Sequence, residues 1–418
     1  MKYIKLLAAM ALAACLSVAV VGCGSSSSSS ASASGSSASA SASASASASS
    51  ASASSSASSA DQAAADEVAA LIDAIYVQEY TDKTYEQCEA AKKAWDALTP
   101  AQQELVKGEE ADPGYFGDDT GDASKDDPLA TAPDKENEIL VVSFGTSYND
   151  SRVATIGAIE KAIQAAYPDW CVRRAFTAQI IINHVYARDG EKILNVDQAL
   201  QQAEQAGVKK LVVVPTHLMH GAEYDELVAA LKPYESKMQI VIAEPLLGEV
   251  GADASVINAD KEVVAKAVVD AACKDAGFAD AAAAADAGTA IVLMGHGTSH
   301  TANVTYDQMQ TEMNQLGYKN VFIGTVEGEP ADTACDVVIG KVKDAGYKNV
   351  ILRPLMVVAG DHANNDMADP EDEESWYSQF VASKAFQNVD CQIAGLGQIA
   401  DVQALYVAHV KDAVDKAA

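Results

Sequence analysis

The chain contains two copies of one pattern, ILVVSFGTS at residues 139–147 and AIVLMGHGTSH at residues 290–300. A second pattern follows each copy, AGVKKLVVVP at residues 206–215 and AGYKNVILRP at residues 345–354. Each apolar run fits a strand buried on both faces. The repeat predicts a duplicated α/β unit, and only its second copy carries histidines in the loop. We therefore expect a cleft between two similar halves, with the chemistry on the second half.

The region from 138 to 418 alternates apolar runs with helical periods, which is typical of parallel sheets covered by helices on both faces. Strands are expected at 138–143, 170–175, 210–214, 239–243, 289–294, 320–325, 350–354 and 391–396. Helices are expected at 151–167, 196–206, 224–234, 260–276, 304–316, 333–345, 375–385 and 402–416. The predicted fold class is α/β, with two Rossmann-like lobes at about 138–255 and about 286–418. In such sheets, ligands bind beyond the carboxyl ends of the strands.

The first residues of the chain are similar to a bacterial lipoprotein signal. Residues 1–22 combine a positive start, an apolar run too short for a stable membrane span, and small residues before Cys23. The resemblance implies cleavage before Cys23 and lipidation of its sulfur; an ordinary secretory signal or an uncleaved anchor is the alternative. Residues 23–60 are rich in Ser and Ala, which predicts a disordered tether. The expected localisation is extracytoplasmic, lipid-anchored to the bacterial cell membrane.

Two further segments separate the tether from the α/β region. Residues 61–108 predict a small helical module, because apolar residues recur at helical spacing and Thr84 and Thr99 suit helix N-termini. We interpret this module as a spacer, with a binding module as the alternative. Residues 109–137 are acidic and contain Gly and Pro, which predicts a linker.

Composition excludes some partners. A formal net charge of −30 and a pI near 4.4 argue against nucleic acid as a partner. Of seven cysteines, Cys15 lies in the signal and Cys23 is expected to be lipidated. The other five are scattered without a C-x-x-C pair, which favours buried apolar cysteines over a disulfide framework. The sequence leaves the oligomeric state open, a homo-oligomer included.

Three polar side chains of the second half follow the ends of three predicted strands. They are His296, Glu327 and His362. Because the carboxyl ends of parallel strands share one edge of a sheet, these side chains can converge. Two imidazoles and one carboxylate suit a divalent first-row metal ion. Asp361 and Asp366 are candidates to orient the imidazoles from behind.

The first half lacks this set. Phe144 stands in the place of His296, and Glu223 stands opposite His362 when the two strands that end in Pro are aligned. The first half keeps His217 and His220 in the sequence PTHLMHG at residues 215–221. The halves have therefore diverged, and the second carries the stronger indication of a metal site.

Other residues near the predicted strand ends are candidates for the walls of the cleft. These are Phe144, Thr146, Ser147, His217, Thr298 and His300. His300 is a candidate to support another histidine or to bind acidic groups of a substrate. Phosphate binding by the GTS loops is an alternative, but the chain lacks a Walker lysine and a GxGxxG motif. A phosphohistidine enzyme is a further alternative, but such a site would need several convergent arginines, and the sequence offers only Arg353 as a candidate.

Five motifs in order resemble the anaerobic sirohydrochlorin cobaltochelatases, the CbiK family. They are SFGTS (143–147), PTHLMHGAEY (215–224), MGHGTSH (294–300), VEG (326–328) and PLMVVAGDHANNDM (354–367). The resemblance covers residues 138–418 and implies class II chelatase-type lobes around a tetrapyrrole cleft. It also implies cobalt insertion without ATP. By resemblance, His296, Glu327 and His362 bind the metal, and His296 is the base that accepts a pyrrole proton.

The chemistry of metal insertion suits these side chains. A divalent cation must lose water, two protons must leave the pyrrole nitrogens, and a neutral imidazole can hold a cation or accept a proton. Co²⁺ is the expected metal substrate of a sirohydrochlorin or related tetrapyrrole, although the same ligands accept Fe²⁺ or Ni²⁺. No tightly bound cofactor is expected. The alternative function is a surface-tethered lipoprotein that captures metal, haem or another tetrapyrrole without turnover, because cobalamin synthesis is normally cytoplasmic.

Overall fold

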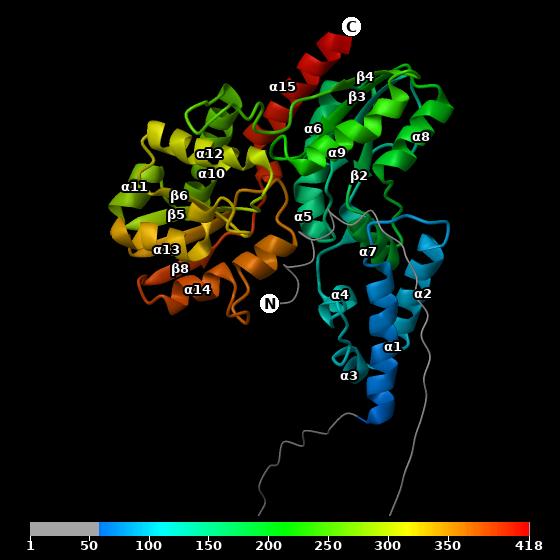
Figure 1. Ribbon diagram of the computed structural model, residues 1–418, viewed down its shortest axis with the longest axis horizontal. Coiled ribbons are helices and arrows are strands. Elements are labelled where there is room, and N and C mark those ends of the chain that lie inside the picture. Colours follow the sequence, from blue (N-terminus) through cyan, green and yellow to red (C-terminus); the bar gives the residue numbers. More distant parts are fainter. Residues whose placement is uncertain (1–57, 418) are drawn as a thin grey trace, which may run out of the picture.

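The structure, a computed structural model, describes residues 58–417. The expected signal peptide, the lipidation site Cys23 and the tether up to residue 57 lie outside the described residues. Two α/β lobes lie side by side, and an N-terminal group of helices packs under the first lobe (Figure 1). Helix α1 begins at Ser59, inside the expected tether, because the Ser58 side chain accepts the Asp61 N–H as an N-cap.

Each lobe is built on a four-stranded parallel sheet. The first sheet contains β1 (Asn137–Ser143), β2 (Cys171–Phe176), β3 (Lys210–Pro215) and β4 (Gln239–Ile242), in the order β2-β1-β3-β4. The second contains β5 (Thr289–Gly295), β6 (Val321–Thr325), β7 (Asn349–Pro354) and β8 (Asn388–Cys391), in the order β6-β5-β7-β8. The two orders are equivalent, which confirms the repeat. In each sheet the strand order reverses beside the first strand, and this is where open α/β sheets bind ligands.

Helices cover both faces of the sheets. The N-terminal group comprises α1 (Ser59–Ile75), α2 (Thr84–Asp96), α3 (Pro100–Gln103) and α4 (Gly114–Gly117). The first lobe contributes α5 (Asn149–Ala154), α6 (Ile156–Ala166), α7 (Gln179–Asp189), α8 (Val196–Ala206) and α9 (Ala222–Leu231). The remaining α-helices are α10 (Ala259–Asp275), α11 (Ala281–Asp286), α12 (Val304–Gln315), α13 (Cys335–Asp344), α14 (Trp376–Ala382) and α15 (Ala400–Ala417). Within residues 58–417, no helix has the length and apolar character needed to cross a bilayer.

Short helical turns connect several of these elements. The 3₁₀ turns are η2 (Ala123–Lys125), η3 (Lys232–Tyr234), η4 (Thr301–Asn303), η5 (Ala331–Thr333) and η7 (Leu396–Gln398), and η6 (Ala363–Met367) is a π-helical turn. Helix α8 shows how the local sequence fixes both ends of a helix. The Asn195 side chain caps its first turn, and Gly207 ends it with a left-handed φ of +75°.

The C-terminal helix α15 leaves the second lobe and packs on the first. It lies against α6, β3 and β4, and Figure 1 shows it (red) beside these strands. The Tyr406 hydroxyl donates to the Thr216 carbonyl at 3.0 Å. One hydrophobic core therefore runs from Ile139 in β1 to Val410 in α15 and includes β5. The sequence region from about 286 to 418 thus supplies cover for both lobes, not for the second alone.

Two expected elements differ from the sequence prediction. The last strand is Asn388–Cys391 rather than 391–396, because the chain then turns away from the sheet edge and the Leu396 N–H donates to Met356 O. The helix expected at 151–167 is split at Thr155, whose φ and ψ are −110° and −79°. The turn η7, which leads into α15, packs at this break: a Cβ on Gly397 would lie 2.9 Å from the Thr155 Cβ. Both differences follow from a tertiary contact that local periodicity does not encode.

The N-terminal helices are joined closely to the first lobe. They share an apolar cluster with α7, and the Asn183 side chain donates to Ile75 O at 2.8 Å. The segment 109–137, expected as a linker, also packs in place. The Asp73 carboxylate accepts the backbone N–H groups of residues 109–111 at 2.8–2.9 Å.

His184 lies inside this junction and gives the fold a dependence on pH. Its ring stacks on Tyr115 with 4.1 Å between centroids, and burial lowers its pKa to about 3. Below pH 6.5, His184 becomes protonated in the unfolded chain but stays neutral in the folded chain. We expect the free energy of unfolding to fall by about 1.4 kcal/mol per pH unit from this group as the pH drops from 6.5 toward 3. Urea unfolding at pH 7 and pH 5 measures it; the His184→Phe variant should show a smaller decrease, and an equal decrease would contradict the assignment.

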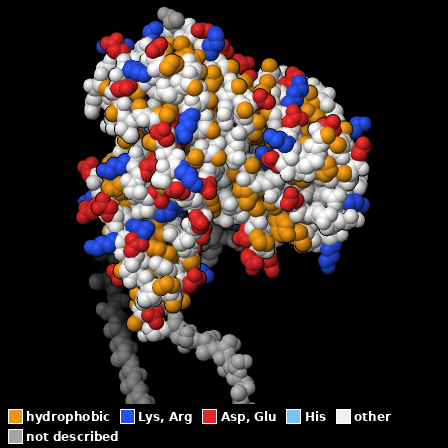
Figure 2. Space-filling model, turned by 180° about the vertical axis from the view of Figure 1, so that it is seen from behind, with side chains coloured by type: hydrophobic (Ala, Val, Ile, Leu, Met, Phe, Trp, Pro, Cys, Tyr) orange, Lys and Arg blue, Asp and Glu red, His pale blue; other side chains and the backbone are white. Residues whose placement is uncertain are grey.

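The surface and the cysteines complete the description. Figure 2 shows acidic side chains over both lobes of the visible face, interspersed with Lys and Arg. The negative charge is thus spread over this face and not gathered in one patch. All five cysteines of the described residues are unpaired, and three of them, Cys88, Cys171 and Cys273, are buried.

Candidate metal centre

His296 stands in a loop whose shape depends on its neighbours. Strand β5 is buried along its whole length and ends at Gly295, so the next residue emerges at the carboxyl edge of the sheet. Gly297 has a φ of +94°, and a Cβ there would lie 2.9 Å from the Glu327 Cβ. Only glycine fits this conformation and this space. The buried hydroxyl of Tyr306 accepts the Gly297 N–H at 3.0 Å, which holds the loop from behind.

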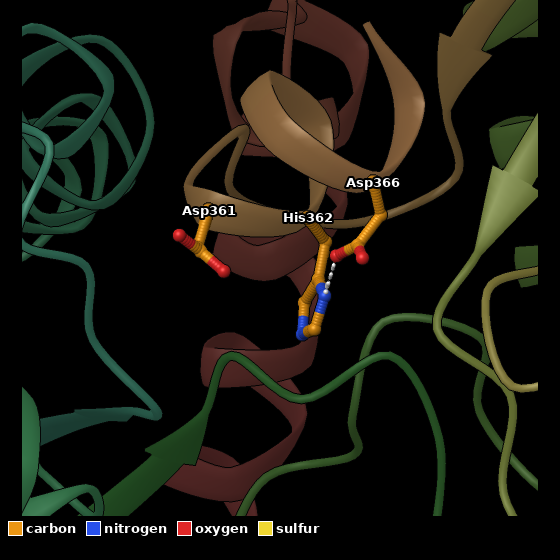
Figure 3. Close-up of side chains that lie close together, drawn as sticks. All are labelled: Asp361, His362 and Asp366. Atoms are coloured by element: carbon orange, nitrogen blue, oxygen red, sulfur yellow. Dashed lines mark hydrogen bonds and ion pairs between the residues drawn. The ribbon is translucent and has the colours of Figure 1, made fainter. Parts of the chain in front are cut away.

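His362 follows the neighbouring strand β7. It directly precedes the π-helical turn η6, a rare conformation that is frequent at functional sites. This turn brings Asp366 back to the histidine, with 2.7 Å between His362 Nδ1 and Asp366 Oδ2. Figure 3 shows Asp361 and Asp366 on either side of the imidazole. One ligand atom from each of these three residues lies within 4.8 Å of the others, which is close enough to hold one metal ion.

The two histidines meet because β5 and β7 are adjacent in the sheet. Their ring centroids are 4.6 Å apart, with 79° between the ring planes. His296 Nδ1 lies 2.8 Å from the Gly297 carbonyl oxygen, and His362 Nδ1 lies against a carboxylate. Since both oxygens only accept hydrogen bonds, each Nδ1 carries the hydrogen in the neutral ring. Each Nε2 therefore keeps its lone pair for a metal ion or a proton.

The two imidazoles differ in basicity. Burial lowers the pKa of His296, and the neighbouring His362 lowers it further. Burial acts in the same direction on His362, but the hydrogen bond and charge of Asp366, with Asp361 and Glu327, outweigh it and raise the pKa of His362. One ring is thus kept neutral near pH 7, whereas the other is held against a carboxylate. The pair combines a proton acceptor with an oriented ligand.

Glu327 and Asp361 add negative charge on the same side of the sheet. The Glu327 backbone N–H donates to His296 O at 2.9 Å, and its exposed carboxylate raises the pKa of both histidines. Asp361 is exposed at the surface, yet partial burial of its carboxyl raises the pKa, and the charge of Asp366 adds to the effect. A divalent cation would relieve the repulsion among these carboxylates.

Asp366 sets which nitrogen of His362 is free, so changing it tests the centre. In Asp366→Asn the amide offers an N–H that favours the other His362 tautomer and places a hydrogen on Nε2. We expect Co²⁺ affinity to fall roughly 10- to 100-fold, measured by calorimetric titration. The matched control is Asp372→Asn in the following exposed loop, where the carboxylate accepts the Glu374 N–H at 2.8 Å. Equal affinities in the two variants would show that Asp366 does not orient the ligand.

A family model described as Cobalt chelatase (CbiK) matches residues 137–415. The chain belongs to the CbiK cobalt chelatase family. It is therefore a chelatase enzyme with a metal ion as a substrate. The match begins at β1, so the N-terminal helices and the segment up to residue 136 lie outside it.

Curated relatives of the CbiK family share this region. The sirohydrochlorin cobaltochelatase of Salmonella typhimurium is 32% identical over 282 residues, covering 67% of this chain and 97% of the relative. Sirohydrochlorin cobaltochelatase CbiKC of Nitratidesulfovibrio vulgaris is 30% identical over 259 residues, covering 61% and 83%. A solved structure of SirB from Bacillus subtilis with Fe³⁺ aligns with a TM-score of 0.43 and 16% identity, covering 68% of this chain and 98% of SirB.

The expected cleft residues of the first lobe surround the loop after β1. Phe144 is 38% exposed at the strand end. Thr146 and Ser147 are buried, and their carbonyl oxygens accept hydrogen bonds from Arg152 at 3.1 Å and from Arg188 at 2.6 Å. The backbone of this loop is therefore fixed by two guanidinium groups.

The other residues expected to line the cleft are His217, His300 and Thr298. Both ring nitrogens of His217 lack a hydrogen bond within the described residues, burial lowers its pKa to about 4, and Nε2 lies 3.5 Å from Glu223 Oε2. His300 Nδ1 caps η4, and its Nε2 lies 3.4 Å from Asp225 Oδ2 of the first lobe. The Thr298 hydroxyl accepts the His300 N–H at 3.1 Å. The roles of these residues in substrate binding stay predictions.

Sequence reasoning missed the residues that hold the two site loops. Tyr306 lies in the first turn of α12, nine residues after Gly297, and no motif in the sequence marks it. Arg152 stands in SRVAT, directly after the GTS loop, and is 0% exposed. The usable signal was its position, because an arginine one turn into a helix after a strand-end loop can reach back to that loop.

Proposed function

We propose that this protein is a sirohydrochlorin cobaltochelatase that inserts Co²⁺ into a tetrapyrrole without ATP. The observation that carries the proposal is the His296–His362 pair, whose ring centroids lie 4.6 Å apart at the sheet edge and whose Nδ1 atoms each face an oxygen, which leaves Nε2 with the lone pair. Membership of the CbiK family and the two curated relatives support the same substrate. The site residues we assign are His296, Glu327 and His362.

The charges of the site suit the reaction. A cation entering the cleft exchanges water for imidazole and carboxylate ligands, and the nearby carboxylates offset the cost of its desolvation. His362 holds the ion through Nε2 while Asp366 keeps Nδ1–H in place. As Co²⁺ moves to the macrocycle, two pyrrole protons must leave. His296 Nε2, kept neutral by its lowered pKa, accepts one of them.

No part of this reaction needs nucleotide energy. Co²⁺ binding to four pyrrole nitrogens replaces two N–H bonds, and the protons pass to the imidazole and then to water. The enzyme supplies dehydration, orientation and a base. Fe²⁺ and Ni²⁺ accept the same ligands, so metal preference is a property to be measured.

We also propose that the enzyme is tethered to the outer side of the bacterial cell membrane through a lipid on Cys23. This proposal rests on the signal-like residues 1–22 and the Ser/Ala-rich stretch that follows. Mass spectrometry of the purified chain tests it. An unmodified Met1 or an unlipidated Cys23 would contradict it.

The function is tested by following absorbance during metal insertion. The assay contains the full-length protein, anaerobic sirohydrochlorin and Co²⁺, Fe²⁺ or Ni²⁺ in turn, with no nucleotide. Several product equivalents per protein, formed faster than in buffer, would support the chelatase. A spectral change that saturates at one equivalent would instead favour capture without turnover, which the lipoprotein-like N-terminus motivates. No change beyond that in buffer would contradict both functions.

A further inference from the structure

Asp126 is a buried carboxylate outside the family match. It ends the turn η2 in the segment between the N-terminal helices and β1, and its side chain is 1% exposed. It accepts hydrogen bonds from Arg152 Nε at 2.6 Å, and from Arg174 Nη1 at 2.5 Å and Nη2 at 2.9 Å. A carboxylate so far from water is stable only when its charge and hydrogen bonds are satisfied, as they are here.

The network around Asp126 contains more acid than base. Two guanidinium groups face three carboxylates, those of Asp126, Glu160 and Glu191. Burial alone would raise the pKa of Asp126, but Arg174 and Arg152 outweigh it and hold the pKa below its ordinary value. Asp126 is therefore ionised at neutral pH. Among the three carboxylates, it accepts short hydrogen bonds from both arginines.

Arg152 connects Asp126 to the GTS loop, which is residues 145–147 after β1. Its side chain is 0% exposed, with Nε on Asp126, Nη2 on Glu191 at 3.0 Å and Nη1 on the Thr146 carbonyl at 3.1 Å. Three acceptors in three directions leave the guanidinium one orientation. The position of the Thr146 carbonyl therefore depends on where Asp126 holds Arg152.

The GTS loop in turn supports the loop that carries His362. Gly360 packs so closely on Thr146 that a Cβ there would lie 2.7 Å from Thr146 Oγ1. The adjacent Ala359 N–H donates to Ser151 Oγ at 3.1 Å. His362 lies two residues beyond Gly360. A displacement of the GTS loop therefore moves the support of a metal ligand in the other lobe.

We propose that Asp126 is a positioning residue for the metal centre, acting through Arg152 and the GTS loop on the His362 loop. This inference rests on the function proposed above. It makes the segment before β1 part of the working enzyme. The chelatase unit of this chain then begins before residue 137, where the family match begins.

The experiment compares two isosteric substitutions of buried carboxylates in the full-length protein, one in the segment before β1 and one in β1. Asp126→Asn removes the charge that bridges Arg152 and Arg174. Glu138→Gln is the control: Glu138 is 0% exposed and accepts from Arg173 at 2.8 and 3.0 Å on the opposite face of β2. Arg173 and Arg174 are consecutive strand residues, so their side chains point to opposite faces. Asp127→Ala controls for the exposed neighbour, whose carboxylate accepts the Leu129 N–H at 3.0 Å.

Three quantities separate positioning from simple stability: the urea midpoint, the Co²⁺ dissociation constant and kcat for insertion. We expect Asp126→Asn and Glu138→Gln to lower the urea midpoint alike. Only Asp126→Asn should weaken Co²⁺ binding and lower kcat, each roughly 10-fold, by analogy with the loss of groups that orient metal ligands. Asp127→Ala should match the wild type in all three. In a double variant, adding Arg152→Leu to Asp126→Asn should weaken Co²⁺ binding no further than Arg152→Leu alone, because the two residues act in series.

The outcomes discriminate this inference from the proposed function. Equal Co²⁺ affinity in Asp126→Asn and Glu138→Gln would overturn the positioning role, whatever the wild type catalyses. A wild type that binds Co²⁺ but inserts none would overturn the proposed function, and the Co²⁺ titration alone would then judge Asp126. A wild type with no Co²⁺ affinity would overturn both. If Asp126→Asn does not fold, Asp126→Glu keeps the charge on a longer arm and should weaken Co²⁺ binding without the loss of a charge.

Discussion

Replacing His296 with Ala is expected to lower kcat for cobalt insertion about 10²- to 10⁴-fold, the range typical for loss of a general base. Removing the ring also removes the Nδ1–H that faces the carbonyl oxygen of buried Gly297 at 2.8 Å. The loop itself stays in place because Tyr306 holds the Gly297 backbone. The loss should therefore fall on proton transfer and metal transfer, and not on folding.

The measurement is the absorbance assay under saturating sirohydrochlorin and Co²⁺, with circular dichroism to show that the fold is kept. His220→Ala is the matched control, since His220 is a partly exposed first-lobe histidine that pairs with Glu244 at 3.1 Å. It should retain the wild-type kcat. An active His296→Ala enzyme would mean that another group takes the pyrrole proton.

Replacing His362 with Ala is expected to remove most of the Co²⁺ affinity. The expected loss exceeds the roughly 100-fold upper range for losing an outer partner, because here a ligand itself is removed. It also leaves the Asp366 carboxylate without the ring nitrogen that it contacts at 2.7 Å. Turnover should fall with the affinity, and raising the Co²⁺ concentration should recover part of it.

Calorimetric Co²⁺ titration, run beside the insertion assay, separates this variant from His296→Ala. We expect His296→Ala to keep more of the affinity than of the turnover, whereas His362→Ala loses affinity first. His220→Ala again serves as the control. A His362→Ala protein that binds Co²⁺ as tightly as the wild type would place the metal ion elsewhere in the cleft.

Much of the fold followed from the sequence because its strands are buried and their ends are marked. The runs before Ser143 and Gly295 contain only residues suited to a doubly covered strand, and they became β1 and β5. The nearness of His296 and His362 also followed, because parallel strands put their carboxyl ends on one edge. The sequence repeat also predicted two similar halves, and the two sheets have the equivalent strand orders β2-β1-β3-β4 and β6-β5-β7-β8.

Other features depend on contacts between distant residues, and composition hides them. The composition of the segment around Asp126 predicts a linker, because acidic residues near Gly and Pro are usually solvated. Residue type alone does not distinguish an aspartate that is buried against two arginines from one that is solvated. Arg152 and Arg174 lie 26 and 48 residues further along the chain, outside any local pattern.

The crossing of α15 constrains how the protein is made. The 18 residues of this helix complete the apolar cover of β3 and β4, although they are translated after both lobes' strands. The nascent first lobe therefore emerges from the ribosome without the part of its apolar cover that α15 supplies, and residues 243–399, 157 residues, must be synthesised before α15 begins. During that interval the exposed strands are a target for chaperones and a hazard for aggregation. Synthesis of the two lobes is sequential, but their folding is completed together.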